Sequence, residues 1–166
     1  MVKVLSFDPA IKNLAACKMD IDNNKISNLE CNIFDLADGK KAKSVKFEKM
    51  INNLLDKLGT IDCSDVKLVL IENIPSMRNP TVKSISIAIF TYFAMKNFDV
   101  HFVSPSRKLS KEENKLSYRE RKKASINKAF ALLNEDDKIK LNDFKKIDDI
   151  ADCINQAINY LRNKND

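Results

Sequence analysis

The sequence has one histidine and no closely spaced pair of cysteines, and these two scarcities exclude several kinds of chemistry. The cysteines at positions 17, 31, 63 and 153 are scattered, whereas a disulfide framework or a zinc site needs clustered spacing. We therefore expect four reduced thiols. Ser-His-Asp or Cys-His catalysis would depend entirely on His101, which lies in the apolar run DVHFV and is predicted to be a strand residue.

Glycine and proline are also scarce, with 2 and 4 among 166 residues, while 44% of the residues are hydrophobic and 31% are charged. This composition predicts a single globular domain over residues 1–166, large enough to bury a core. No run approaches the ~20 apolar residues needed to span a bilayer. The first predicted strand starts at Val2, which leaves no room for a targeting segment. We expect a soluble, cytoplasmic protein without membrane association, from a viral or bacterium-like setting.

The net charge of +6 is concentrated in one segment. Residues 107–123 contain eight basic and three acidic side chains, so this segment alone carries +5. A charge run of this kind is typical of a solvated face as well as of a nucleic-acid contact. The run by itself leaves both interpretations open.

Hydrophobic periodicity predicts a fixed order of strands and helices. Strands are expected at residues 2–8, 14–21, 25–34, 66–72 and 99–105, and helices at 47–58, 80–98, 121–133 and 148–162. Ser117 and Glu120 form a capping-box pattern before the third helix. Three consecutive strands with short connections favour antiparallel pairing, and the alternation that follows favours parallel pairing. The predicted fold class is α/β, with a mixed five-stranded sheet and helices on both faces.

Two of the predicted strands, VLSFD and VLIE, end in an acid, Asp8 and Glu72 respectively. A carboxylate at the edge of a core is costly unless it is paired or coordinates a cation. The alternative is that each strand has simply ended and its acid faces water. A single strand that ends in an acid would fit this alternative well, but two such strands make it weaker.

The last predicted helix begins with further acids at positions 148, 149 and 152. At 100° per residue, Asp149 and Asp152 lie about 60° apart, away from the apolar face, and could chelate from one turn. Acids at a helix N-terminus are also favoured by the helix dipole, by ~0.3–1 kcal/mol. Asp148 and Asp152 are closer still in angle, so spacing leaves the choice of pair open.

Carboxylate ligands without histidine favour a hard cation, Mg²⁺ or Mn²⁺. Two divalent ions would neutralise several converging carboxylates and would stabilise the attacking and departing oxygens of a phosphoryl displacement. Together with the basic segment, the acids predict a metal-dependent nuclease.

Four motifs resemble one family. They are D-P-A-I-K-N-L-A after the first strand, I-E at the end of the fourth, S-Y-R-E-R-K-K, and D-D-I-A-D. This series, in this order from position 8 to 152, is similar to that of the poxvirus Holliday junction resolvases. These belong with the bacterial RuvC-type and fungal mitochondrial resolvases in the ribonuclease H-like superfamily. The resemblance implies a ribonuclease H-like fold, a homodimer, and symmetric nicking of four-way DNA junctions that leaves 5′-phosphate and 3′-hydroxyl ends. The two alternatives are a ribonuclease H-like enzyme that cuts hybrids or flaps and a junction-binding protein that never cuts.

The resemblance also assigns roles to residues. The metal-binding acids that it implies are Asp8, Glu72, Asp149 and Asp152, holding two Mg²⁺ per site with Mn²⁺ as a substitute. Lys122 or Lys123, with Lys123 favoured, would lie near the scissile phosphate. The candidate DNA contacts are Lys12, Asn13, Arg78, Arg107, Arg119, Arg121, Lys122 and Lys123.

One position departs from the pattern of many relatives. Ala10 stands two residues after the first acid, where many relatives have glycine. Glycine permits a close approach of the backbone to a phosphate, so alanine puts that contact in doubt, but not the metal site. The largely apolar helix from Val82 to Met95 is the candidate dimer interface.

Overall fold

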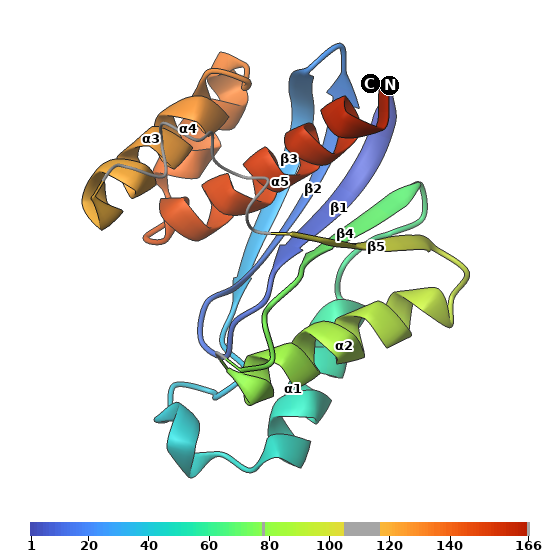
Figure 1. The fold of residues 1–166 in the computed structure, drawn as a ribbon, viewed down its shortest axis with the longest axis vertical. Helices are drawn as coiled ribbons and strands as arrows, with labels where there is room; N and C mark the ends of the chain where they lie inside the picture. Colours follow the sequence, from blue (N-terminus) through green and yellow to red (C-terminus); the bar gives the residue numbers. More distant parts are fainter. Residues whose placement is uncertain (78, 105–116, 166) are drawn as a thin grey trace.

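The computed structural model describes residues 1–77, 79–104 and 117–165, and Figure 1 shows their arrangement. The elements in chain order are β1 (Val2–Asp8), β2 (Leu14–Asp22), β3 (Lys25–Phe34), the short 3₁₀ helix η1 (Ala42–Ser44), α1 (Phe47–Gly59), β4 (Leu68–Glu72), α2 (Pro80–Ala94), β5 (Asp99–Val103), α3 (Tyr118–Phe130), α4 (Glu135–Asn142) and α5 (Ile147–Asn165).

The strands form one mixed sheet in the order β3-β2-β1-β4-β5. β1 pairs antiparallel with β2, and β2 pairs antiparallel with β3, whereas β1–β4 and β4–β5 are parallel. The predicted five-stranded α/β sheet is therefore confirmed.

Alternating side chains of the strands pack into two separate cores, one on each face of the sheet. Val4 of β1 and Leu70 of β4 face α5 and the helices beside it. Leu5 and Phe7 face the opposite way, against α1 and α2. Figure 1 shows the same division, with α3, α4 and α5 on one side of the sheet and α1 and α2 on the other. Helices on both faces were predicted from the sequence.

The structure differs from the predicted helices at α2, at α4 and at α3, which spans Tyr118–Phe130 rather than residues 121–133. α2 ends at Ala94 rather than at residue 98, because the chain turns at Asn97, which has a positive φ of 62°. α4 was not predicted. Its start is capped by Asn134, whose side-chain oxygen accepts from the backbone N–H of Asp137 at 2.8 Å, but its sequence has little hydrophobic periodicity.

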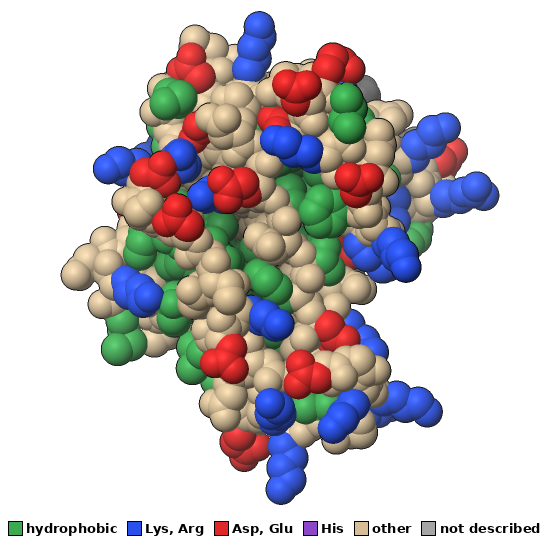
Figure 2. All heavy atoms as spheres, turned by 180° about the vertical axis from the view of Figure 1, so that it is seen from behind, with side chains coloured by type: hydrophobic (Ala, Val, Ile, Leu, Met, Phe, Trp, Pro, Cys, Tyr) green, Lys and Arg blue, Asp and Glu red, His purple; other side chains and the backbone are tan. Residues whose placement is uncertain are grey.

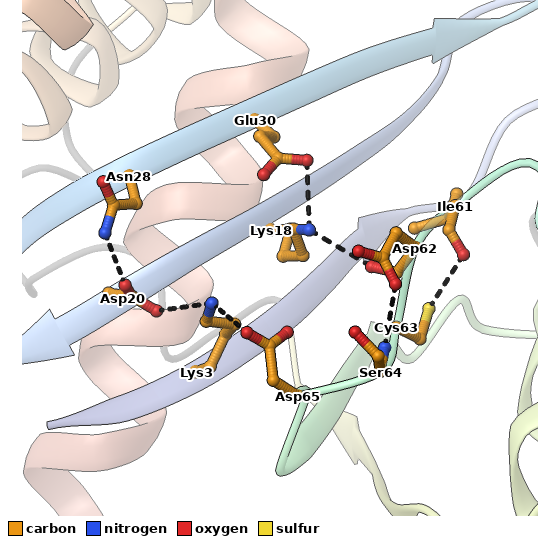
Figure 3. A network of polar contacts seen from close by, with 10 residues as sticks. All are labelled: Lys3, Lys18, Asp20, Asn28, Glu30, Ile61, Asp62, Cys63, Ser64 and Asp65. Carbon is orange, nitrogen blue, oxygen red and sulfur yellow. Dashed lines mark hydrogen bonds and ion pairs between the residues drawn. The ribbon is translucent and has the colours of Figure 1, made fainter.

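A charged network closes the end of the sheet at which β1 begins (Figure 3). Lys3 contacts Asp65 and lies 3.5 Å from Asp20, and Lys18 donates to the carbonyl oxygen of Asp62 at 3.2 Å. The hydrogen bond from Lys3 lowers the pKa of Asp65. These contacts fasten the α1–β4 connection to β1 and β2.

The expectations about thiols and histidine are also met. All four cysteines are free. His101 lies in β5 and contacts Asp99 through Nε2 at 2.7 Å. Within the described part of the chain, no helix has both the length and the apolar character that a bilayer crossing requires.

Candidate active site

Asp8 and Glu72 end two strands that lie next to each other. β1 and β4 are parallel, and their last aligned pair is Phe7 with Ile71, so the two acids follow side by side at the carboxyl end of the sheet. Because side chains alternate along a strand, Asp8 lies on the same face as Ser6, and Glu72 on the same face as Leu70. Both acids therefore belong to the face that α5 covers.

The last helix, α5, brings its acidic N-terminal turns to this end of the sheet. Near its far end, Arg162 donates to the side chain of Asn24 in the β2–β3 turn at 3.0 Å, so α5 runs antiparallel to β1. Gln156 anchors the middle of the helix, since its amide nitrogen donates to Ser6 Oγ at 3.1 Å and to the carbonyl oxygen of Phe7 at 3.2 Å. Cys153 Sγ lies 3.6 Å from the carbonyl oxygen of Ala15, the residue paired with Asp8.

Asp152 accepts a hydrogen bond from another helix. Ser125 of α3 donates through Oγ to Asp152 Oδ1 at 2.9 Å. Asn155 lies on α5 three residues after Asp152. Its amide nitrogen donates to Ser125 Oγ at 3.0 Å and to the carbonyl oxygen of Ser125 at 2.9 Å. These hydrogen bonds, from Asn155 to Ser125 and from Ser125 to Asp152, therefore fix the orientation of the Asp152 carboxylate, one of the predicted metal ligands.

Asp148 and Asp149 have opposite electrostatic environments. Asp148 pairs with Lys122, and although burial opposes ionisation, this contact lowers the pKa of Asp148. The pKa of Lys122 is raised by the same contact and by Tyr118. The pKa of Asp149 is raised, first by burial and then by the charge of Asp148.

The predicted basic residues differ in their exposure. Lys123 is exposed on α3, and Arg119 lies at the exposed start of the same helix, whereas Arg121 and Lys122 are partly buried. Lys122 is committed to Asp148 in this structure.

Other predicted DNA contacts lie away from α3. In the β1–β2 connection Lys12 is exposed and Asn13 is partly buried. The predicted contacts Arg78 and Arg107 lie outside the described residues.

The acids fit a hard cation by their chemistry, although they are not grouped around one point. Across the described residues, no three His, Cys, Asp or Glu side chains are grouped closely enough to hold a metal ion. The carboxylates of Asp148 and Asp152 contact α3 instead. The donors at this end of the sheet are carboxylate oxygens, and the raised pKa of Asp149 reflects a burial and repulsion that a nearby cation would relieve.

Sequence reasoning missed three residues of the site, namely Ser125, Asn155 and Gln156. Their sequence signal is weak, because polar residues in a helix are usually solvent-exposed. Asn155 and Gln156 are each 1% exposed, which is unusual for amides; the hydrogen bonds described above satisfy their amide nitrogens.

Comparison with solved structures identifies the fold, which is that of the RuvC-type Holliday junction resolvases. The fowlpox virus resolvase, solved with its substrate Holliday junction DNA, aligns with a TM-score of 0.67 and 24% identity over 98% of this chain and 99% of that one. RuvC of T. thermophilus, solved in complex with a Holliday junction substrate, aligns with a TM-score of 0.67 and 14% identity over 99% and 97% of the two chains.

The family follows from the sequence match. The family of the poxvirus A22 protein matches residues 1–164, and the chain belongs to this family. The uncharacterised protein L451 of Acanthamoeba polyphaga mimivirus is 27% identical over 181 residues, which cover 84% of this chain and 44% of that protein. The chain thus spans less than half the length of this relative.

Proposed function

We propose that this protein is a Holliday junction resolvase, a metal-dependent endonuclease that makes symmetric nicks in four-way DNA junctions. The observation that carries the proposal is the site itself: Asp8 and Glu72 lie side by side on the face covered by α5, whose first turns supply Asp149 and Asp152. Family membership and the shared fold support it. The cytoplasmic location expected from the sequence is part of the same proposal.

Asp8, Glu72, Asp149 and Asp152 would hold the metal, two Mg²⁺ ions with Mn²⁺ as a substitute. When bound, such ions supply an activated water and stabilise the departing 3′-oxygen. The products are then 5′-phosphate and 3′-hydroxyl ends.

The chain's own side chains position the substrate and the ligands. Exposed Lys123 adds positive charge beside the phosphate, whereas Lys122 holds Asp148 and thereby links α3 to α5. Ser125 fixes Asp152 in place. Arg119, Arg121, Lys12 and Asn13 contact the sugar–phosphate backbone, which orients the duplex without reading its sequence.

Two symmetric nicks require two sites, so the proposal includes a homodimer. The outer face of α2 supports it, because Ser84, Ile87, Thr91 and Met95 form an exposed stripe without a charged side chain. An uncharged, partly apolar helix face suits self-association through a two-fold axis.

The test is cleavage of a labelled four-way junction in Mg²⁺, with linear duplex and RNA–DNA hybrid as alternative substrates. We expect paired nicks in the junction alone. We expect Asp8→Asn and Glu72→Gln to lose more than ~100-fold in rate, because each removes a charged metal ligand and the loss of a group behind a ligand already costs about 10–100-fold. Junction binding by both variants should persist.

Other outcomes would replace the proposal. Cleavage of the hybrid alone would keep the metal site and change the substrate. Binding of the junction by the wild type without cleavage, in either Mg²⁺ or Mn²⁺, would leave a junction-binding protein.

A further inference from the structure

We propose a second DNA-binding surface on the other side of the sheet, formed by residues 40–46 between β3 and α1. This segment, the lysine loop, has the sequence KKAKSVK, with four lysines and no acid. The inference rests on the proposed function and extends it: the lysine loop binds the phosphate backbone of a duplex arm of the junction, outside the contacts predicted for α3.

The lysine loop lies beyond the same end of the sheet as the acids. Leu14, the first residue of β2, pairs with Phe34, the last residue of β3, so the chain leaves β3 at the end where Asp8 closes β1. The backbone N–H of Leu36 then donates to the carbonyl oxygen of Ile11 at 2.8 Å. The approach to the lysine loop is thus held against the β1–β2 connection, which carries Lys12 next to Ile11.

The two basic surfaces lie on opposite faces of the sheet. α3 packs with α5 on one face, whereas η1 and α1 lie at the lower end of the molecule on the α2 side (Figure 1). In the view from behind, lysine and arginine side chains project from this lower end, with aspartate and glutamate side chains between them (Figure 2). A DNA strand that enters the site between these surfaces therefore meets positive charge on both sides. The arms of a branched duplex diverge from one point, so their phosphates can face both basic surfaces, α3 and the lysine loop.

Hydrogen bonds hold the backbone of the lysine loop and of the residues that lead into it. Within the loop, the backbone N–H of Lys40 donates to the carbonyl oxygen of Ala37 at 3.0 Å and that of Ser44 to the carbonyl oxygen of Lys41 at 2.9 Å. Asp35 accepts from the backbone N–H groups of Ala37 and Gly39 at 2.8 and 2.9 Å. Asn53 of α1, only 5% exposed, donates to the carbonyl oxygen of Leu36 and to the carboxylate of Asp38, both at 2.9 Å. A fixed backbone lowers the entropy lost when the lysines bind a phosphate backbone.

The charge of the lysine loop is not neutralised within the chain. Lys40, Lys41, Lys43 and Lys46 are all exposed, and none of them makes an ion pair with a described residue. Of the acids nearest in sequence, Asp35 accepts from backbone N–H groups and Asp38 from Asn53, while Glu48, two residues after Lys46, makes no ion pair with a described residue. Clustered lysines without partners match the closely spaced charges of a nucleic-acid backbone, and each phosphate contact releases counterions.

The experiment measures the affinity for a synthetic four-way junction at several salt concentrations, in EDTA so that no strand is cut. The test variant carries Lys40→Gln, Lys41→Gln and Lys43→Gln. The matched control carries Lys25→Gln, Lys67→Gln and Lys96→Gln, which remove the same charge from exposed positions at the opposite end of the sheet.

We expect the test variant to bind about tenfold more weakly at low salt, and its plot of log affinity against log salt to be shallower by roughly 2–3, since each lost phosphate contact removes about 0.9. The control variant should have the same junction affinity and the same salt dependence as the wild type. Lysine-to-arginine changes at the same three positions should retain affinity, and equal melting temperatures of test and control variants would exclude misfolding as the cause.

The outcomes separate this inference from the proposal on which it rests. If the wild type binds the junction and the test and control variants bind it equally well, the lysine loop is not a DNA contact and the resolvase proposal stands. If the wild type binds no junction, both are wrong.

Discussion

At the scale of single residues, the hydroxyl of Ser125 has a defined direction. Its oxygen accepts from the amide of Asn155 at 3.0 Å, so its one proton is available for Asp152, 2.9 Å away. A carboxylate held in this way keeps one orientation, whereas a free aspartate samples several. Ser125 is therefore a positioning residue for a proposed metal ligand.

Ser125→Ala should reduce junction cleavage by ~10–100-fold, the usual cost of losing a group that orients a metal ligand. We also expect a higher Mg²⁺ concentration at half-maximal rate, with junction affinity in EDTA unchanged. Ser125→Thr, which restores a hydroxyl, should recover part of the activity.

The matched control is Ser86→Ala on α2. Ser86 is also a buried helical serine, but its hydroxyl donates only to the carbonyl oxygen of Lys83, at 2.7 Å. If both variants lose the same activity with the same Mg²⁺ dependence, the role of Ser125 is structural.

The residues of the site were predictable from the sequence to different degrees. Asp8 and Glu72 were found because an apolar run that stops at an acid marks a strand end, and the structure places both at the ends of neighbouring strands. Ser125 was not found, because its bond to Asp152 depends on how α3 packs on α5, which no local pattern records. Periodicity could not separate Asp148 from its neighbours either. The structure shows Asp148 paired with Lys122.

At the scale of elements, α5 connects the core to the site. Its apolar side, including Ile150, Ile154 and Ile158, is fully buried against the sheet and α3, while its first turns carry the acids. The amphipathic pattern predicted this helix well. α4 was missed, because its short sequence shows a cap but scarcely any apolar face.

Ile154→Ala should lower the free energy of unfolding by about 2–5 kcal/mol, since it leaves a cavity at a site with no exposed surface. Chemical denaturation measures this loss. Ile139→Ala on α4 is the control, because Ile139 is 65% exposed and its truncation should cost little. Equal losses in the two variants would mean that α5 does not pack as described.

At the scale of the whole molecule, the proposed homodimer depends on the outer face of α2. Ile87 is 47% exposed in the middle of the uncharged stripe, and Ser84 and Thr91 are exposed beside it. Ile87→Glu should convert a dimer into a monomer, because it places two carboxylates near a two-fold axis in an apolar contact.

Light scattering would show this as a halving of the mass, and junction cleavage would change from paired to single nicks. Ile139→Glu, at an exposed isoleucine on α4, should leave both unchanged. A wild type that is already monomeric at working concentrations would contradict the proposed dimer.

The order of the acids along the chain has a consequence for synthesis. Asp8 lies in the first strand, and Asp149 and Asp152 lie in the last helix, so more than 140 residues separate partners of the proposed site. A ribosome that has translated the chain as far as β5 has produced every strand of the sheet but only half of the carboxylates. In the proposed mechanism, the growing polypeptide therefore cannot cut DNA until α5 has emerged and docked, and a prematurely terminated product does not nick the genome around it.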